Sequence, residues 1–414
     1  MANIKNTVRK DGYVKSKIYL GDGKYKYVYA RTNADLEEKV IAAKTKLGKG
    51  IDLMAENDTF GYWRQSWLRV KRTEASAKWF ESCETYANKL SDLDNVKVVK
   101  LRAMDLQTLL IDMSLEKNQS GKYYSERTLK ITRDIAREVL DMAVDNRVLE
   151  YNPFARVKVP KAQREPEKRQ SLTAEQQRWI YDTPHRAQTA AMIMMCAGLR
   201  RGELLALTWS DIDLEAKTIS VNKAVEMISG KPSVKLCGKT DAAMRTVFIP
   251  DRLVAYLRQQ PRPALLVCPS ASGALMTQSA WRKMWESYLA ELNVRYGDFE
   301  HNLAYQQRHG GASGHYRPST RFDPEAIPFM IPRFTAHWLR HTFITNMYLA
   351  GVDVLTAKQQ AGHSDIKVTM DIYTHLDSNH QSRSMEKLND FLDGGIDGGI
   401  KKQSNRITEP FTGT

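Results

Sequence analysis

The sequence is poor in cysteine and has no long apolar run. Its four cysteines are widely spaced and form no C-x-x-C pair, so a disulfide framework is excluded; they are Cys83, Cys196, Cys237 and Cys268. The longest apolar stretch, near residues 190–199, is shorter than the roughly 18 residues that a membrane span needs, and it ends at two arginines. The first residues lack the apolar segment of a signal peptide. These absences predict a protein of a reducing, cytosolic compartment without a membrane partner.

Positive charge is what the sequence has in excess. The 414 residues carry a net charge of +14, and residues 1–50 hold 12 Lys and Arg against 5 Asp and Glu. An excess of this size is typical of proteins that bind a polyanion, most often nucleic acid. Its concentration near the N-terminus favours a dedicated basic module over a uniformly basic protein.

The first fifty residues predict a small β-sheet followed by one helix. Asp22-Gly23 is a dipeptide typical of hairpin turns, and lysine and tyrosine alternate in KYKYVYAR at 24–31. Asn33 is expected to cap a helix that ends at Gly48. Interleaved lysine and tyrosine suit contacts to DNA phosphates and grooves, although a hairpin solubilised by lysine is the ordinary alternative. The candidate DNA contacts are Lys15, Lys17, Lys24, Lys26 and Arg31.

Two further regions follow this basic segment. Residues 58–160 predict a purely helical region, and Pro153 and Pro160 exclude a helix at its end. The charged segment 161–170 is the expected domain boundary. The predicted helices lie near residues 60–70, 74–91, 102–114 and 124–147. The expected multidomain layout is a basic β-sheet DNA-binding domain (1–50), an all-α domain (58–160), a linker (161–170), a mixed, mainly helical α+β domain (171–393) and a disordered tail (394–414).

The segment GLRRGE, residues 198–203, places two arginines and a glutamate inside an apolar stretch. Taking a guanidinium out of water costs several kcal/mol unless it is paired. We therefore expect Arg200 to be buried beside Glu203, with its remaining N–H groups directed at an anion. Arg201 lies outside this arrangement and is expected to be solvated or to touch a backbone phosphate.

Three more segments carry polar groups at suggestive spacings. GKTDAAMRTVFIP predicts a β-hairpin that presents Lys239 near its turn. TAHWLRHTF places His337 and Arg340 three residues apart on one helical face. AGHSDIKVTMDIYTH has His363 ten residues before Tyr373. Each residue alone has an ordinary explanation, such as a solvated lysine or a structural histidine, so only the whole set indicates a site.

As a set, these residue types fit one reaction. When an oxygen nucleophile attacks a phosphodiester, extra negative charge develops on the phosphoryl oxygens, and two arginines can hold it through paired donors. Histidines can donate hydrogen bonds or handle a proton near neutral pH. A lysine can protonate the departing oxygen, and a tyrosine can act as the nucleophile. The set predicts phosphoryl transfer without a metal or another cofactor.

The chain resembles the tyrosine recombinases, or phage-type integrases, over residues 58–390. The resemblance rests on the order and spacing of five motifs, GLRRGEL, GKT, H-x-x-R, GHS and I-Y-x-H. The helical region of the chain is similar to the family's core-binding domain, and its basic sheet to the arm-binding domains of integrases from conjugative transposons and temperate phages. The resemblance implies an enzyme that integrates and excises a mobile element through a 3′-phosphotyrosine bond. The implied partners are double-stranded DNA with core and arm sites, a homotetramer on that DNA, and an excisionase or DNA-bending protein, all in the bacterial cytosol and nucleoid.

The resemblance also implies a role for each matching residue. Tyr373 matches the nucleophile, Arg200 and Arg340 the phosphate-clamping pair, Lys239 the general acid, His337 a proton handler, His363 a phosphate hydrogen-bond donor, and Glu203 the acid that braces the first arginine.

Three other functions compete with this one. A metal hydrolase is suggested by the spacing of His337 and His341, but Trp338 stands where a metalloprotease needs Glu, and Arg340 would repel a cation. No metal site is therefore predicted. A DNA-relaxing enzyme of the type IB topoisomerase kind would share the tyrosine chemistry. A catalytically silent DNA-binding regulator would share only the charge.

Overall fold

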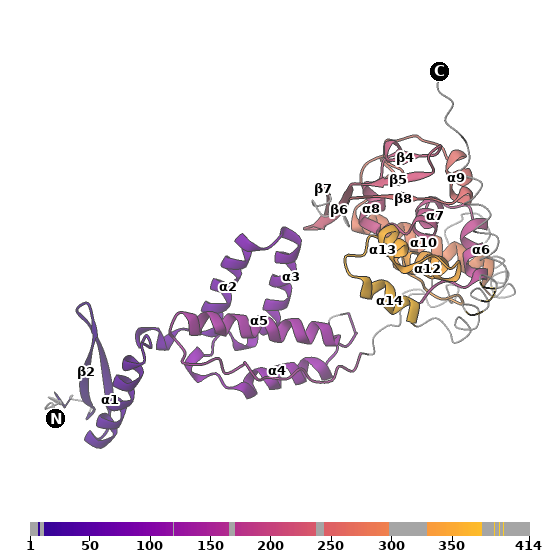
Figure 1. Ribbon diagram of the computed structural model, residues 1–414. Helices are drawn as coiled ribbons and strands as arrows, with labels where there is room; N and C mark the ends of the chain where they lie inside the picture. Colours follow the sequence, from indigo (N-terminus) through magenta and orange to yellow (C-terminus); the bar gives the residue numbers. More distant parts are fainter. Residues whose placement is uncertain are drawn as a thin grey trace, which may run out of the picture. The chain divides into compact units, whose positions relative to one another are not determined.

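The structure, a computed structural model, describes residues 7–8, 12–118, 120–164, 170–236, 244–297 and 329–374, together with Met385, Asn389 and Leu392; for 7–8 and 371–374 it describes the backbone only. The chain divides into two compact units, Met1–Lys168 and Arg169–Thr414 (Figure 1). The division falls inside the segment expected to be a linker. The finer division of the first unit into two domains stays a prediction, and the expected tail 394–414 lies outside the described residues. No described helix is long and apolar enough to cross a membrane.

The first unit begins with an antiparallel sheet in the order β1-β2-β3, comprising β1 (Thr7–Val8), β2 (Val14–Gly21) and β3 (Lys24–Ala30). Asp22 and Gly23 join β2 to β3 with φ angles of 45° and 73°, as a tight hairpin requires. Alternate residues of the sheet, among them Ile18, are buried against α1 (Asn33–Gly48). The predicted sheet and helix are therefore confirmed.

The predicted helix cap is wrong by one residue. Thr32, not Asn33, has the extended backbone of an N-cap, and its hydroxyl accepts a hydrogen bond from the backbone N of Asp35 at 3.1 Å. Asn33 is the first residue of the helix, so the capping position falls to Thr32.

The rest of the first unit is helical. It comprises η1 (Met54–Asn57), α2 (Phe60–Glu74), α3 (Ala77–Ala87), η2 (Asn88–Leu93), η3 (Val98–Lys100), α4 (Ala103–Leu115) and α5 (Glu126–Asp145). Along α5 the buried residues recur every three or four positions, which gives one apolar face that packs against α2, α3 and α4. Ser125 begins α5 by accepting a hydrogen bond from the backbone N of Thr128. The all-α character predicted for this region is confirmed.

The described part of the second unit contains two small antiparallel sheets. One has the order β4-β5-β8, comprising β4 (Ile212–Asp213), β5 (Thr218–Val221) and β8 (Arg245–Phe248); the other pairs β6 (Lys223–Ile228) with β7 (Lys231–Leu236). The hairpin expected at 238–250 includes residues outside the described part of the chain, Lys239 among them, so it stays a prediction. β8 pairs with β5, which places Val247 beside Ile219 in the core, and β7 pairs with β6.

Helices surround these sheets. They are α6 (Ala174–Asp182), α7 (Gln188–Ala197), α8 (Arg201–Ala206), η4 (Trp209–Asp211), α9 (Asp251–Arg258), α10 (Gln278–Tyr296), α12 (Ala336–Leu349), α13 (Val354–Ala361) and α14 (Ile366–Thr374). α7 is buried on nearly every side and is the central helix of the unit. α12 packs along α7, while α13 and α14 pack on α12 (Figure 1). The arrangement brings the end of α7, the middle of α12 and the end of α13 together.

Candidate active site

The turn between α7 and α8 positions the first predicted arginine. α7 ends at Ala197, and Gly198 follows with a φ of 67°, a left-handed conformation that favours glycine. Arg200 is the N-cap of α8, and its backbone N donates to Oε2 of Glu203 at 2.8 Å. Nη1 of Arg200 donates to Oε1 of the same carboxylate, also at 2.8 Å. Glu203 thus fixes both the backbone and the side chain of Arg200.

The expectation that Arg200 is buried is wrong. Its side chain is 43% exposed, whereas that of Glu203 is 6% exposed. The guanidinium is held along one edge by Glu203 and by the carbonyl oxygen of Gly362, and its remaining surface stays open to water. The partial exposure spares the arginine most of the cost of desolvation and leaves it reachable by an anion.

The second predicted arginine is the buried one. Arg340 lies on α12 and is 2% exposed, and its guanidinium donates to the carbonyl oxygens of Gly198 and Ala361. Burial, together with the nearby charge of Arg200, lowers the pKa of Arg340 to about 9, so the side chain still carries its charge at neutral pH. Arg340 therefore joins the turn after α7 to the end of α13.

His363 follows the glycine that ends α13. Gly362 has a φ of 64° and turns the chain from α13 toward α14. The Nδ1 of His363 lies 2.9 Å from Oγ1 of Thr369 on α14, and both side chains are buried. Burial first, and then the charges of Arg340 and Arg200, lower the pKa of His363 to about 3. The imidazole is therefore neutral at physiological pH.

These residues line one cavity of about 300 Å³. It brings together four of the six predicted catalytic residues, which come from three separate segments. His337 is exposed at its edge, and its ring lies perpendicular to that of His341, with 4.7 Å between the ring centres. The full lining comprises Arg200, His337, Arg340, His341, Ile344, His363, Ser364 and Val368. Two or more guanidinium groups beside neutral imidazole form a site for an oxyanion.

Two predicted residues are not placed in this cavity by the described structure. Lys239 lies outside the described residues, between β7 and β8. Tyr373 is on α14, the helix that supplies Val368 to the cavity, but its side chain is not described. The roles of both residues stay predictions.

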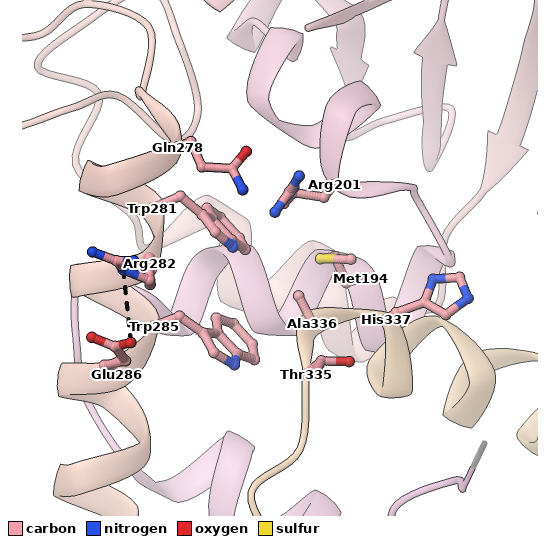
Figure 2. Close-up of a pocket in the computed structure, with 10 residues that line it drawn as sticks. All are labelled: Met194, Arg201, Gln278, Trp281, Arg282, Trp285, Glu286, Thr335, Ala336 and His337. Carbon is pink, nitrogen blue, oxygen red and sulfur yellow. Dashed lines mark ion pairs between the residues drawn. The ribbon is translucent and has the colours of Figure 1, made fainter. Parts of the chain in front are cut away.

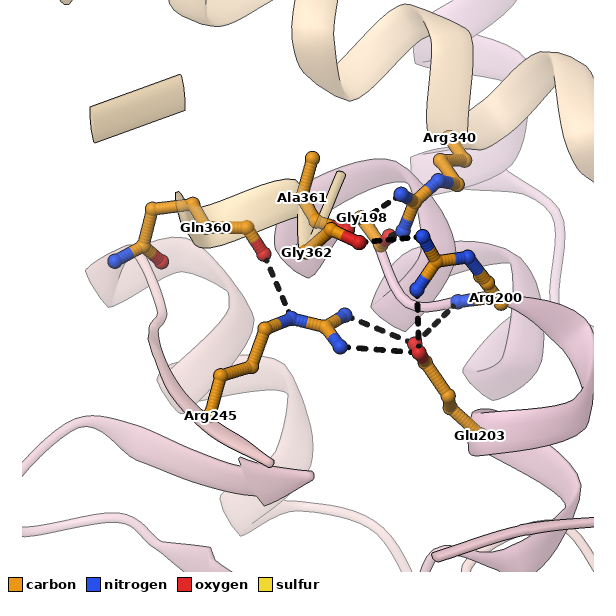
Figure 3. A network of polar contacts seen from close by, with 8 residues as sticks. All are labelled: Gly198, Arg200, Glu203, Arg245, Arg340, Gln360, Ala361 and Gly362. Atoms are coloured by element: carbon orange, nitrogen blue, oxygen red, sulfur yellow. Dashed lines mark hydrogen bonds and ion pairs between the residues drawn. The ribbon is translucent and has the colours of Figure 1, made fainter. Parts of the chain in front are cut away.

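Arg245, on β8, is a member of this cluster that the sequence analysis missed (Figure 3). Its Nη1 and Nη2 donate to Oε1 and Oε2 of Glu203 at 3.0 and 2.9 Å. Burial alone would raise the pKa of Glu203, but the guanidinium of Arg245 and the backbone N of Arg200 lower it to about 2. The alternation of β8 could have revealed this residue, since Arg245 shares a strand face with the buried Val247.

A second cavity, of about 450 Å³, adjoins the first and shares His337 with it (Figure 2). Arg201 extends into this cavity, whereas Arg200 lines the first one, so the two adjacent arginines serve different surfaces. Trp281 and Trp285 of α10 form its wall, with their rings stacked 5.6 Å apart. Among the described residues, no group of three or more His, Cys, Asp or Glu could hold a metal ion.

The predicted DNA contacts of the first unit divide between the two faces of its sheet. Lys15 and Lys17 lie on the face away from α1, where Nζ of Lys17 is 4.8 Å from the centre of the Tyr25 ring. Lys24 and Arg31 are exposed near the strand ends. This face presents positive charge and aromatic rings together.

Lys26 differs from the other four residues, because its ammonium group already has partners within the protein. It forms an ion pair with Glu56 and donates to the carbonyl oxygen of Leu53. A DNA contact through Lys26 stays a prediction, and its geometry favours a structural role.

The sequence model of the phage integrase family matches residues 170–380, which is just over half of the chain. A XerC-like tyrosine recombinase of Caldanaerobacter subterraneus is 24% identical over 386 residues, spanning 89% of this chain and 92% of the relative. The ICEBs1 integrase of Bacillus subtilis is 26% identical over 264 residues, spanning 62% of this chain and 63% of the relative. The alignment thus covers less than two thirds of the second relative's length.

The fold is similar to that of the integrase of transposon Tn1549, solved in complex with a circular intermediate DNA. The TM-score is 0.58 at 18% sequence identity, and the match covers 80% of this chain and 99% of that one. At this identity the likeness concerns the fold alone. It agrees with the predicted combination of a helical region and a mixed α+β region.

Proposed function

Because the chain belongs to the phage integrase family and is therefore a tyrosine recombinase, we propose that it integrates and excises a mobile element. In this proposal it breaks and rejoins double-stranded DNA through a 3′-phosphotyrosine bond, in the cytosol of its host. The observation that carries the proposal is the convergence of Arg200, Arg340 and His363 on one cavity.

The cavity suits a phosphodiester whose negative charge increases during attack. The exposed edge of Arg200 and the buried guanidinium of Arg340 would hold the phosphoryl oxygens from two directions. Both carboxylate oxygens of Glu203 accept hydrogen bonds from Arg200 and Arg245, and none of the guanidinium bonds of Arg340 goes to Glu203. Donors held in place before the reaction stabilise the transition state without the cost of reorganisation.

The neutral His363 supplies a further donor. We assign the hydroxyl of Thr369 as the donor to Nδ1, so that the imidazole proton lies on Nε2 and can be donated to a phosphoryl oxygen. His337, exposed at the edge of the cavity, would accept the proton of the Tyr373 hydroxyl as that oxygen attacks phosphorus. Lys239 would protonate the 5′ oxygen that leaves, which balances the cleavage step.

We propose the remaining parts of the layout from the family assignment and the charge. The helical region would bind the core site, and the exposed face with Lys15 and Lys17 would bind arm sites. Four protomers would act on two duplexes and exchange one pair of strands at a time. An excisionase or a DNA-bending protein would assist in choosing the direction.

A covalent-trapping assay tests this function. The core site is obtained by sequencing the junction of the excised circular element, and a duplex nicked beside the scissile phosphate is mixed with the protein in EDTA. We expect a protein–DNA adduct on a denaturing gel, and none with Tyr373→Phe, which should bind the same DNA. Joined recombinant strands would separate a recombinase from a relaxing enzyme. No adduct on DNA that the protein binds would contradict the proposal and favour a silent regulator.

A further inference from the structure

We propose that Arg245 is a positioning residue that sets how Arg200 and His363 face the scissile phosphate. The inference rests on the proposed function, because it assigns a task within the same reaction. Arg245 itself cannot meet DNA, since its side chain is 4% exposed and both of its Nη groups are bonded to Glu203. It must therefore act through the groups that it holds.

Those groups include the end of α13, where three successive carbonyl oxygens accept hydrogen bonds from three different arginines (Figure 3). Nε of Arg245 donates to the oxygen of Gln360 at 3.1 Å, Arg340 donates to that of Ala361, and Arg200 to that of Gly362. Carbonyl groups at the end of a helix have no partner within the helix and carry its negative pole. The arginines thus fasten the peptide that leads directly into His363.

The contact between Arg245 and this turn is close. A Cβ added at Gly362 would lie 2.7 Å from Nη1 of Arg245, and the φ of +64° also disfavours any other residue there. The turn therefore packs directly against the guanidinium, with no space for a side chain between them. A shift of Arg245 would be passed on to His363 and to α14, the helix that carries Tyr373.

Arg245 also determines how strongly the carboxylate of Glu203 attracts the guanidinium of Arg200. With Arg245 present, the carboxylate is shared by two guanidinium groups, and Arg200 keeps an edge open to the cavity. Without it, the whole negative charge of Glu203 would act on Arg200 alone and draw it away from the phosphate.

The test is Arg245→Lys, which keeps a positive charge beside Glu203 but cannot bond both carboxylate oxygens and Gln360 in one plane. Single-turnover cleavage is measured on two nicked duplexes, one with the ordinary scissile phosphodiester and one with a neutral methylphosphonate in its place. The matched control is Arg258→Lys, which alters an exposed ion pair with Glu215 outside the cluster. Unfolding temperature and DNA affinity are measured for all variants.

We expect Arg245→Lys to cleave the phosphodiester about 100-fold more slowly than the wild type, the size of loss that a small misplacement of reacting groups produces. On the methylphosphonate, which lacks the charge that Arg200 would hold, the difference should fall to about 3-fold or less. Equal losses on both substrates, or no loss on either, would overturn the proposal. A purely structural defect would slow both substrates alike.

If Arg245→Lys does not fold, Gly362→Ala serves as the second variant, because it displaces the guanidinium while keeping every charge. The same selective loss on the phosphodiester is expected, and its absence counts against the proposal. Wild-type protein that binds both duplexes and cleaves neither would instead overturn the proposed function. The two failures are therefore distinguishable.

Discussion

The Nδ1 of His363 and the hydroxyl of Thr369 lie 2.9 Å apart inside the turn that joins α13 to α14. Thr369 is fully buried, so its hydroxyl is directed at the imidazole and is not shared with water. With the hydroxyl assigned as the donor to Nδ1, the proton of the neutral imidazole lies on Nε2. The pair therefore ties the orientation of His363 to the helix that carries Tyr373.

Thr369→Val should reduce cleavage while leaving DNA affinity unchanged. Valine fills nearly the same space but removes the hydrogen bond, so the imidazole proton is no longer confined to Nε2. We expect single-turnover cleavage about 3- to 10-fold slower, in line with the loss of one net hydrogen bond. Thr369→Ser, which keeps the hydroxyl, is the matched control. Equal rates for the valine and serine variants would contradict the assigned tautomer.

Stability should fall as the pH drops below about 6.5, with His363 as one cause. Its folded-state pKa of about 3 lies below the ordinary 6.5, so the unfolded chain binds a proton that the folded protein resists. The stabilisation is complete above pH 6.5 and is lost as the pH falls toward 3, by at most about 1.4 kcal/mol per pH unit. Burial lowers the pKa of His185 as well, so it adds a loss of the same sign.

Urea unfolding of the wild type and of His363→Gln at pH 7 and pH 5 isolates this effect. The variant should lose less stability between the two pH values, because the His185 contribution remains and that of His363 is gone. Glu203, with a pKa of about 2 against 4.5, loses its contribution only below pH 4.5 and does not disturb the comparison. If the free energy of unfolding fell equally in both proteins between pH 7 and pH 5, His363 would be protonated in the folded state at pH 5, against this prediction.

Substitution of Arg200 should change the rate of cleavage, whereas substitution of the adjacent Arg201 should change the affinity for DNA. Arg200→Ala removes a donor from the proposed clamp, and we expect cleavage in the bound complex to slow by about 100- to 1,000-fold. Arg201→Ala alters the second cavity, so it should weaken DNA binding while the bound complex still cleaves at nearly the normal rate. Titration followed by single-turnover cleavage at saturating protein measures both quantities. If the Arg200→Ala variant cleaved at the normal rate, Arg200 would not be one of the residues that hold the scissile phosphate.

The helices were largely predictable because their signals are local. The buried positions of α5 recur at helical spacing, and the observed helix lies within the predicted 124–147. The helix predicted at 74–91 begins three residues later and changes to a 3-10 helix near its end. Ser76 caps a new helix by accepting a hydrogen bond from the backbone N of Trp79, and the chain tightens into η2 after Ala87. Such interruptions depend on one side chain, which the apolar period does not record.

Four of the six predicted catalytic residues lie in one cavity, whereas the roles of Lys239 and Tyr373 stay predictions and the geometry of the site could not be predicted. Arg200 and Glu203 are three residues apart, so their pairing could be inferred locally. The burial of Arg340 and its bond to Gly198 depend on contacts between residues that are distant in the sequence. The same is true of Arg245, whose partners come from α8 and α13, although strand alternation could have indicated that it is buried.

Gly198→Ala should destabilise the protein for two separable reasons. A Cβ at Gly198 would lie 2.3 Å from the ring of Phe343, and the φ of +67° adds backbone strain. We expect the free energy of unfolding to fall by about 2 to 5 kcal/mol. Gly230→Ala is the control, since its φ is +75° but nothing lies within 4 Å, so only the strain of about 1 to 2 kcal/mol applies. In a Phe343→Ala background the cost of Gly198→Ala should shrink to that of the control.

The basic sheet should bind DNA through one of its faces only. Lys15 and Lys17 lie on the exposed face, so changing both to Gln should weaken binding to DNA from the ends of the element and reduce the salt slope by about 2. Lys26→Gln should leave the slope unchanged and lower the free energy of unfolding by about 1 kcal/mol, because the ammonium is paired with Glu56. Binding measured over a range of salt concentrations, with urea unfolding of each variant, tests both statements. Lys26→Gln could instead reduce the salt dependence of DNA affinity as much as the change of one exposed lysine does. That result would mean that Lys26 breaks its ion pair with Glu56 and contacts a phosphate.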